Sequence, residues 1–459
     1  MSYCYNTPED QRQMLQAIGL DSLDALFDSI PAPLRMQRAL DIPGAMGELE
    51  LTAHLAQLAK RNASPSEKIS FLGGGSYDHF VPAVVDYVSA RGEFYTSYTP
   101  YQPEVSQGNL QAMFEYQTLI CQLTGMEVAN QSLYDGGSAA VEAVLMAMSV
   151  QRRQGRVVTA GSVHPEYRQI IETYFANLKT QLVTLETPQG TLPPATLEAA
   201  LSDDTACVLV QQPNFFGCLE EVEQLAEITH RAGALLVVVT DPISLGILKR
   251  PGDYGADVVV GEGQCLGTPM QFGGPYLGIM ACREKFVRRM PGRIAGQTVD
   301  RQGRRCWVLT LQTREQHIRR EKATSNICTN QGLFALRASV YLAAMGPTGM
   351  REAARLCLQK ARYAQAQLFA SGRLEPVFAA PTFKEFVVRD RLADVDGLLA
   401  DALQAGFLAG VPLGRWYPQL SDCLLVSVTE KRTQAQIDAL AQFVAKTTPI
   451  KTVEHAKHA

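Results

Sequence analysis

The sequence contains no apolar run that approaches the roughly 20 residues needed to cross a bilayer. Its first ten residues lack both the basic start and the apolar segment of a signal peptide. The formal net charge is only −4, which argues against a nucleic-acid or polyanion surface. We therefore expect a cytoplasmic protein that has neither a membrane nor a nucleic acid as its partner.

Cysteine pairs with metal-binding spacing are also absent. The ten cysteines are scattered singly, none forms a Cys-x-x-Cys motif, and none lies at zinc-finger spacing from a histidine. Most of them lie within apolar runs, as Cys207 does in residues 206–210. This usage predicts buried, reduced thiols, no metal site and a reducing compartment.

A chain of 459 residues, 46% of them hydrophobic, is long enough for two or three domains. Residues 1–68 have apolar side chains at helical spacing and predict an N-terminal helical arm. Residues 69–330 contain short apolar strands separated by helices, which predicts a large α/β domain with a mainly parallel, seven-stranded type of sheet. Residues 331–459 predict a long helix, broken near Gly346-Pro347, and a small C-terminal α+β domain.

Two predicted strands of the large domain end in polar or glycine-rich sequence. The run 235–240 ends at Asp241, and the run 257–260 leads into residues 261–267. Ligands of such sheets bind beyond the carboxyl ends of the strands. The three glycines at 261, 263 and 267 superficially resemble a dinucleotide-binding motif. The third glycine falls one residue late and no helix is predicted after it, so we reject that interpretation.

Two further segments have both a functional and a structural interpretation. Gly136-Gly137-Ser138 opens an apolar helix, whose free N–H groups could bind a phosphate. Ser138 could equally be an ordinary N-cap residue. His164 follows the predicted strand 157–160, where it could stack on a cofactor ring or simply cap the next helix.

The most unusual segment is residues 95–104, which contain three tyrosines, two threonines, a serine, a glutamine and a glutamate. Its two prolines and its polar density argue against a strand packed on the core. Loops this rich in aromatic side chains usually bind a partner chain or a ligand. The basic clusters Arg301-Arg304-Arg305 and Arg319-Arg320-Lys322 are local, and each could be a solvated loop face or an anion-binding loop.

Residues 98–108, 255–264, 320–329 and 429–433 resemble the glycine cleavage system P proteins (glycine dehydrogenase, decarboxylating). The resemblance covers essentially the whole chain and is closest to the N-terminal half, which is a separate subunit 1 in some organisms. It implies the fold-type I pyridoxal-phosphate (PLP) dependent transferase fold. It also implies a reaction in which glycine is decarboxylated on PLP and the aminomethyl group passes to the lipoyl arm of H protein.

In fold-type I enzymes an Asp after the first of these two strands pairs with the pyridine nitrogen, and a Lys after the second forms the imine. Asp241 matches the first position. Gln264 or Cys265 occupies the second, and neither can form an imine. The nearest lysines, Lys249 and Lys285, lie in a loop and beyond the next strand. The resemblance therefore implies that a lysine-bearing subunit 2 holds PLP covalently, in an assembly of the α2β2 type.

This chain would then complete an active site at the interface, and three groups of residues are candidates. The interface active-site loop consists of Tyr95, Thr96, Ser97, Tyr98, Thr99, Tyr101 and Gln102. The second interface loop contributes Arg320, Lys322, Thr324 and Asn326, and a vestigial PLP-like pocket contains Gly137, Ser138, His164 and Asp241. Two alternatives remain at this point: a standalone PLP decarboxylase or transaminase with a displaced lysine, and a non-enzymatic structural or regulatory pseudoenzyme.

Overall fold

The computed structural model describes residues 6–270, 273–274 and 276–447, and the chain divides into two units, residues 1–63 and 64–459. The first unit contains α1 (Pro8–Ala17) and α2 (Glu48–Ala59), close to the helices predicted there. Thr7 and Asp10 form a capping box that starts α1. Neither helix buries a side chain among the described residues, and Leu49 is 85% exposed. The apolar faces of both helices are therefore left open.

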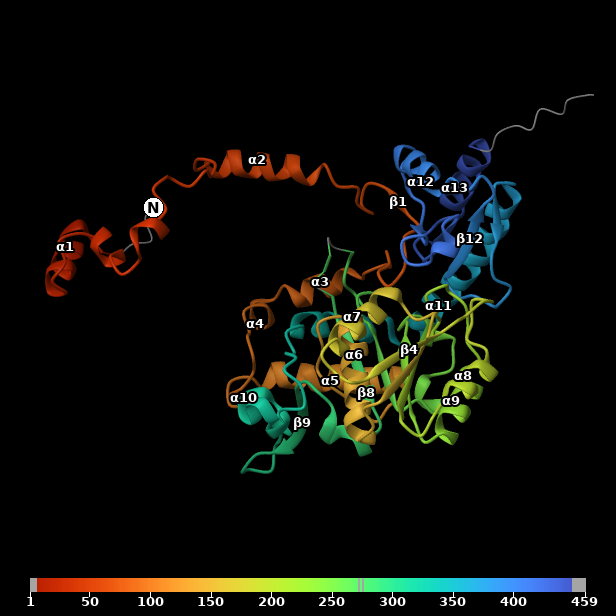
Figure 1. Ribbon diagram of the computed structural model, residues 1–459, viewed down its shortest axis with the longest axis horizontal. Helices are drawn as coiled ribbons and strands as arrows, with labels where there is room; N and C mark the ends of the chain where they lie inside the picture. Colours follow the sequence, from red (N-terminus) through yellow and green to blue (C-terminus); the bar gives the residue numbers. More distant parts are fainter. Residues whose placement is uncertain (1–5, 271–272, 275, 448–459) are drawn as a thin grey trace, which may run out of the picture. The chain divides into compact units, whose positions relative to one another are not determined.

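A seven-stranded sheet forms the centre of the second unit, in the order β2-β8-β7-β6-β5-β3-β4 (Figure 1). Its strands are β2 (Val128–Ala129), β3 (Arg156–Ala160), β4 (Gln181–Leu185), β5 (Thr205–Gln212), β6 (Leu235–Thr240), β7 (Val258–Glu262) and β8 (Gly278–Cys282). The run from β7 to β4 is parallel, while β8 is antiparallel to both β7 and β2. The strands predicted at 157–160, 235–240 and 257–260 correspond to β3, β6 and β7, and the two-residue β2 was too short to give a pattern.

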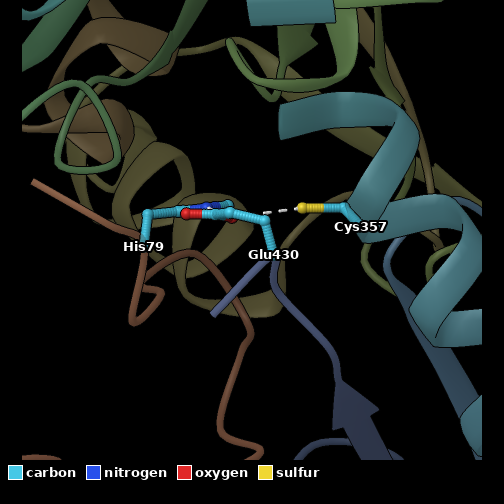
Figure 2. Close-up of side chains that lie close together, drawn as sticks. All are labelled: His79, Cys357 and Glu430. Carbon is cyan, nitrogen blue, oxygen red and sulfur yellow. Dashed lines mark hydrogen bonds and ion pairs between the residues drawn. The ribbon is translucent and has the colours of Figure 1, made fainter. Parts of the chain in front are cut away.

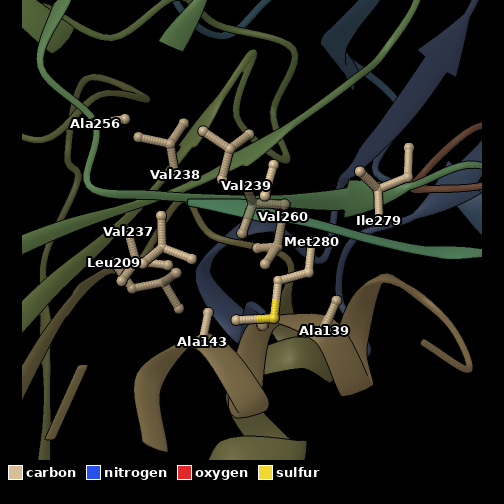
Figure 3. Close-up of a cluster of buried hydrophobic side chains, with 14 of the residues drawn as sticks. Ala139, Ala143, Leu209, Val237, Val238, Val239, Ala256, Val260, Ile279 and Met280 are labelled. Atoms are coloured by element: carbon tan, nitrogen blue, oxygen red, sulfur yellow. The ribbon is translucent and has the colours of Figure 1, made fainter. Parts of the chain in front are cut away.

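Helices pack around this sheet and supply most of its core. They are α5 (Gln107–Thr124), α6 (Gly136–Gln151), α7 (Pro165–Phe175), α8 (Pro194–Ala200) and α9 (Val222–Arg231). Figure 3 shows Ala139 and Ala143 of α6 facing the sheet beside Leu209, Val237 and Met280, and all five are fully or almost fully buried. The small alanines let the helix approach the strands closely, which brings the start of α6 to the carboxyl ends of the parallel strands.

The C-terminal part begins with α11 (Gly332–Ala370), which is kinked at Gly346, where φ is +58°. Pro347 follows and cannot donate a helical hydrogen bond, so the predicted break near 346–347 is confirmed. An antiparallel sheet of order β11-β12-β15-β14 follows, with a core of its own. Its elements are β11 (Leu374–Pro376), β12 (Glu385–Asp390), α12 (Val395–Gln404), β14 (Val411–Pro412), β15 (Cys423–Ser427) and α13 (Gln434–Lys446). β1 (Ile69–Ser70) pairs with β13 (Phe407–Leu408).

The hairpin of β9 (Ile294–Val299) and β10 (Arg305–Thr310) was not predicted from the sequence. Arg301 and Arg304 of the first basic cluster lie in its turn, and Arg304 pairs with Asp300 at 2.8 Å. The remaining short helices are α3 (Ala83–Ser89), α4 (Gly92–Tyr95) and α10 (Gln316–Arg319). The 3-10 helices are Asp24–Phe27, Ala32–Leu34, Ser244–Gly246, Pro251–Tyr254, Glu284–Arg289, Gln312–Arg314, Arg320–Lys322 and Pro418–Leu420.

The boundaries of the three predicted domains stay a prediction, although the two sheets have separate hydrophobic cores. Within the described ranges, none of the helices combines the length and the apolar character that crossing a membrane would require.

Candidate functional site

The tyrosine-rich loop forms one wall of a cavity of about 360 Å³. Four of the predicted loop residues line it: Tyr95, Ser97, Tyr98 and Thr99. Phe94 and Pro100, which flank these residues, belong to the same wall. The other walls come from α5, from Gln131, from Arg293 and from the start of α11 with the residues just before it, and they consist of Asn109, Ala112, Met113, Gln131, Arg293, Thr329, Asn330, Gly332, Leu333, Ala335 and Leu336. Segments far apart in the sequence thus meet around one open, hydroxyl-rich space.

Among the residues that the structure describes, Arg293 is the one cationic side chain that lines this cavity, and it was not predicted from the sequence. Its guanidinium donates to the Thr329 hydroxyl at 3.0 Å and to the Tyr101 hydroxyl at 3.1 Å, and it lies over the Tyr101 ring at 5.5 Å. Among the described residues no carboxylate forms an ion pair with Arg293. An unpaired guanidinium beside several hydroxyl groups favours a carboxylate or a phosphate as the ligand.

A second arginine holds the turn that carries Arg293. Arg314 is buried, and its guanidinium donates to the carbonyl oxygens of Met290, of Gly292 (3.0 Å) and of Leu311 (3.1 Å). Charge-assisted bonds to several carbonyls restrain the backbone that they join. Arg314 therefore positions Arg293 without reaching the cavity itself.

The tyrosines of the loop are unusually exposed for their type. Tyr98 is 93% exposed and Tyr95 is 68% exposed, although both also line the cavity. Thr96 and Gln102 are exposed as well and lie outside the cavity lining. Exposed aromatic side chains around a polar cavity are typical of a surface that another molecule covers.

The second predicted loop lies near this surface without lining the cavity. Arg320, Lys322 and Asn326 are exposed, and Thr324 is half-buried. The same loop reaches the cavity only later, through Thr329 and Asn330. None of the four predicted residues is among the described residues that line the cavity, where Arg293 provides a cation instead.

The predicted vestigial pocket is filled by the protein's own side chains. Asp241 follows β6 as expected, and its Oδ2 lies 2.8 Å from Nζ of Lys384, a residue that comes directly before β12. The backbone N–H of Ile243 donates to the other oxygen of Asp241 at 3.0 Å. Burial lowers the pKa of Lys384, but Asp241 and the acidic groups of Cys265, Cys357 and Glu385 together outweigh this effect, and the pKa is raised. The amine is therefore a buried cation.

The start of α6 is occupied in the same way. Asp135 is the N-cap residue, and its carboxylate accepts from the Ser138 N–H at 2.7 Å, so the interpretation of Ser138 as N-cap was wrong. The Glu262 carboxyl accepts from the Gly136 N–H at 2.9 Å. A Cβ atom on Gly137 would lie only 2.5 Å from Ile170, because α7 packs directly against the helix start. Carboxyl oxygens thus take the N–H groups that a phosphate would use.

Gln264, one of the two residues expected at the imine position, lies just beyond β7, and the structure shows which contacts it makes. It is 1% exposed, its oxygen accepts from the Tyr77 N–H at 2.9 Å, and its amide nitrogen donates to the Tyr77 and Thr268 carbonyls at 3.0 and 2.7 Å. Both N–H donors of this side-chain amide and one of the two lone pairs of its oxygen are therefore used in hydrogen bonds. The neighbouring Cys265 is also buried.

Known proteins are similar to this chain over almost its whole length. A family model described as "Glycine cleavage system P-protein" matches residues 1–444. A probable glycine dehydrogenase (decarboxylating) subunit 1 from Carboxydothermus hydrogenoformans is 51% identical over 444 residues, covering 97% of this chain and 99% of the relative. The corresponding protein from Geotalea uraniireducens is 52% identical over 445 residues, covering 96% and 99%.

The chain belongs to the glycine cleavage system P-protein family.

Among solved structures, the glycine decarboxylase (P-protein) of the glycine cleavage system in inhibitor-bound form is 42% identical, with a TM-score of 0.87. The match covers 97% of this chain and 100% of that one. A sphingosine-1-phosphate lyase of Burkholderia pseudomallei (15% identity, TM-score 0.65, covering 91% and 94%) shows the fold alone. The predicted fold-type I fold is confirmed. The chain matches the split-form subunit 1 of glycine dehydrogenase (decarboxylating) over its full length, and the expectation of an enzyme subunit is confirmed.

PLP, which this fold family implies, does not fit the residues of this P-protein chain. The position opposite Asp241 holds the Lys384 ammonium, and the start of α6 is bonded to Glu262 and Asp135. The His164 ring stacks on the Tyr167 ring, with the centroids 4.5 Å apart. His164 is also the N-cap residue of α7, where its side chain accepts from the Glu166 N–H, so the ring is already in contact with other parts of the protein. Neither an open phosphate site nor an open ring site is left among these groups.

One cluster near Lys384 has the composition of a metal site: His79, Cys357 and Glu430, drawn in Figure 2. His79 Nδ1 lies 2.6 Å from Glu430 Oε2, and the Cys357 thiol donates to the same oxygen at 3.4 Å. The other ring nitrogen of His79 lies 3.0 Å from the Lys384 ammonium. Burial raises the pKa of Glu430, but His79 and the Phe80 N–H outweigh it, and the pKa falls to about 2. The hydrogen-bonding groups of these side chains are therefore already paired with one another. A metal ion bound here would also be repelled by the nearby Lys384 ammonium.

The second loop is anchored by a buried carboxyl whose titration can be tested. Glu142 of α6 is 4% exposed and accepts from the Ser325 hydroxyl at 2.8 Å. Burial raises the pKa of Glu142 to about 7. Because the pKa of this carboxyl is higher in the folded chain than in the unfolded chain, the folded chain binds the proton more tightly. The free energy of unfolding therefore falls as the pH rises from about 4.5 through 7.

We expect Glu142→Gln to remove that loss, because the amide keeps an acceptor for Ser325 without a charge. The stability of Glu142→Gln is compared with that of the natural chain at each pH. The variant should become relatively more stable, with a relatively higher melting temperature, between pH 5 and pH 9, and the change in the free-energy difference should be at most about 3 kcal/mol. Thermal melts at these pH values measure it, with the exposed Glu115→Gln as control. A difference that does not change with pH would contradict the expectation.

Proposed function

We propose that this chain is the subunit of a heteromeric glycine decarboxylase that completes an active site whose lysine and PLP belong to a partner subunit. The observation that carries the proposal is the cavity with the unpaired Arg293 guanidinium and the exposed tyrosine-rich loop. The relatives named as subunit 1 support the existence of a partner. The filled position opposite Asp241 supports the view that the cofactor lies elsewhere in the assembly.

The ligand chemistry of the cavity suits that role. Glycine brings a carboxylate, and PLP, which supplies the electron sink when it is bound, brings a phosphate. Arg293 offers N–H donors that can bind either anion in a bidentate manner. Tyr98, Ser97 and Thr99 line the same cavity and add hydroxyl donors. We propose that these groups bind and orient an anion presented from the partner's side, while the tyrosine rings exclude water from it.

The exposed apolar surfaces favour a large interface with the partner. Tyr95 and Tyr98 project from the loop, and the apolar faces of α1 and α2 have no cover within their own unit. Obligate interfaces are rich in aromatic and aliphatic side chains. We propose an α2β2 assembly in which Tyr95, Thr96, Tyr98, Tyr101 and Gln102 face the partner and the entry of the lipoyl arm of H protein. Arg320, Lys322, Thr324 and Asn326 remain candidates for the rim of the same interface.

Reconstitution separates this proposal from the pseudoenzyme alternative. The chain alone, incubated with PLP, is expected to catalyse no glycine–bicarbonate exchange, because Gln264 cannot form an imine. Co-expression with a lysine-bearing P-protein subunit and addition of lipoylated H protein should give exchange at least 100-fold above either subunit alone. If the partner subunit were fully active without this chain, the proposed completion of the active site would be wrong.

A further inference from the structure

The fold places a charged side chain of the protein itself where the family's cofactor ring would lie. A pyridinium N–H that donates to a carboxylate has its nitrogen about 2.7–2.9 Å from the oxygen. Nζ of Lys384 lies 2.8 Å from Oδ2 of Asp241, so it makes the contact that the ring nitrogen would make. A ring cannot be inserted between two groups that are already in hydrogen-bond contact.

Two further side chains hold Lys384 in this position. The face of the Tyr77 ring covers the ammonium, with Nζ 3.4 Å from the ring centroid. His79 Nε2 accepts at 3.0 Å, and the lysine is 1% exposed. Gln264 clamps the backbone of Tyr77 through both its N–H and its carbonyl, so the residue at the imine position keeps the aromatic cover in place.

We propose that Lys384 is an internal substitute for the cofactor: its ammonium neutralises Asp241 in place of a pyridinium and closes the site in this chain to PLP. The same contact joins the strand end after β6 to the strand β12 of the C-terminal sheet. The chain therefore folds around a completed pocket without a cofactor. Lys384 is also unsuited to be a displaced imine-forming lysine, because its amine lies against Asp241 where the ring nitrogen would be, which leaves no room for a ring beside it.

A double-mutant cycle on the full-length chain tests the ion pair. Lys384→Met leaves Asp241 buried without its counter-ion, and Asp241→Asn does the same to Lys384. Each is expected to lower the melting temperature by about 5 °C or more. The double variant should recover at least half of the larger loss, because removing both charges leaves neither unpaired. Lys249→Met, at an exposed ion pair with Glu223, is the matched control and should change the melting temperature by less than about 1 °C. Losses that simply add in the double variant, or no loss in either single variant, would overturn the proposal.

A labelling experiment on the natural chain tests the closed site independently of any variant. The chain is incubated with PLP, reduced with borohydride and digested, and its peptides are mapped by mass spectrometry. Exposed lysines such as Lys249 are expected to carry some phosphopyridoxyl label, and Lys384 none. Labelling of Lys384, or one equivalent of PLP retained after gel filtration with an imine absorbance band, would show that the pocket accepts the cofactor and would overturn the proposal.

Discussion

Replacing Arg293 by alanine in the assembled enzyme is expected to lower glycine–bicarbonate exchange by roughly 30-fold or more. Arg293 is the one cation among the described residues that line the cavity, and no described carboxylate pairs with it. The loss of a charge-assisted, bidentate contact to an anion costs about 2–5 kcal/mol, which corresponds to a factor of about 30 or more. If the contact is made to the glycine carboxylate, KM should rise; if it is made to the cofactor's phosphate, the affinity for PLP should fall instead.

Two further variants show whether the guanidinium acts through its geometry. Arg293→Lys keeps the charge but loses the fork of donors, so it should recover only part of the activity. Tyr101→Phe removes the hydroxyl that accepts from Arg293 and should have a smaller effect than Arg293→Ala. Arg391→Ala serves as the control, since Arg391 is exposed and pairs with Glu375 in the C-terminal sheet. An Arg293→Ala assembly with unchanged kcat, KM and PLP affinity would remove this cavity from the active site.

The sequence predicted the fold well where the patterns were long and regular. Nearly continuous apolar runs such as residues 235–240 gave the buried parallel strands, and Gly346-Pro347 marked the kink of α11. The hairpin β9–β10 was missed, since its strands are only half-buried and its apolar alternation is interrupted by Gly296 and by charged residues. Whether a two-residue strand such as β2 forms is decided by tertiary pairing and not by local sequence.

The site was predicted less completely, and the reason is that it depends on contacts between distant segments. The tyrosine-rich loop was visible because its composition is unusual over ten consecutive residues. Arg293 gave no such signal, since a single arginine after a Pro-Gly turn is ordinary and only the fold brings it 3.1 Å from the Tyr101 hydroxyl. Lys384 left a weak signal: with Glu385 it places two ionisable groups within the otherwise apolar stretch 383–388, and both are buried. Buried charges of this kind require partners, and the sequence cannot name them.

The second large effect is expected from Gly217→Ala, which should lower the free energy of unfolding by about 4 kcal/mol or more. Gly217 has φ +79°, and the N–H of Phe383 donates to its carbonyl at 3.2 Å. A Cβ atom here would lie 2.0 Å from the carbonyl oxygen of Glu385, which is backbone and cannot rotate away. The left-handed conformation alone costs an alanine about 1–2 kcal/mol, and the steric overlap adds several more. Urea unfolding of the full-length chain measures the sum.

Gly372→Ala separates the two causes, because the position has almost the same backbone angle and none of the crowding. Gly372 follows α11 with φ +78°, is exposed, and has no atom within 4 Å of the site of a Cβ. It should lose only about 1–2 kcal/mol, the conformational part. The difference between the two variants is then the cost of pushing Glu385, and with it Lys384, away from the large sheet. If both variants lost the same free energy, the close approach of Gly217 to β12 would contribute nothing to stability, and the joint between the two sheets would have to lie elsewhere.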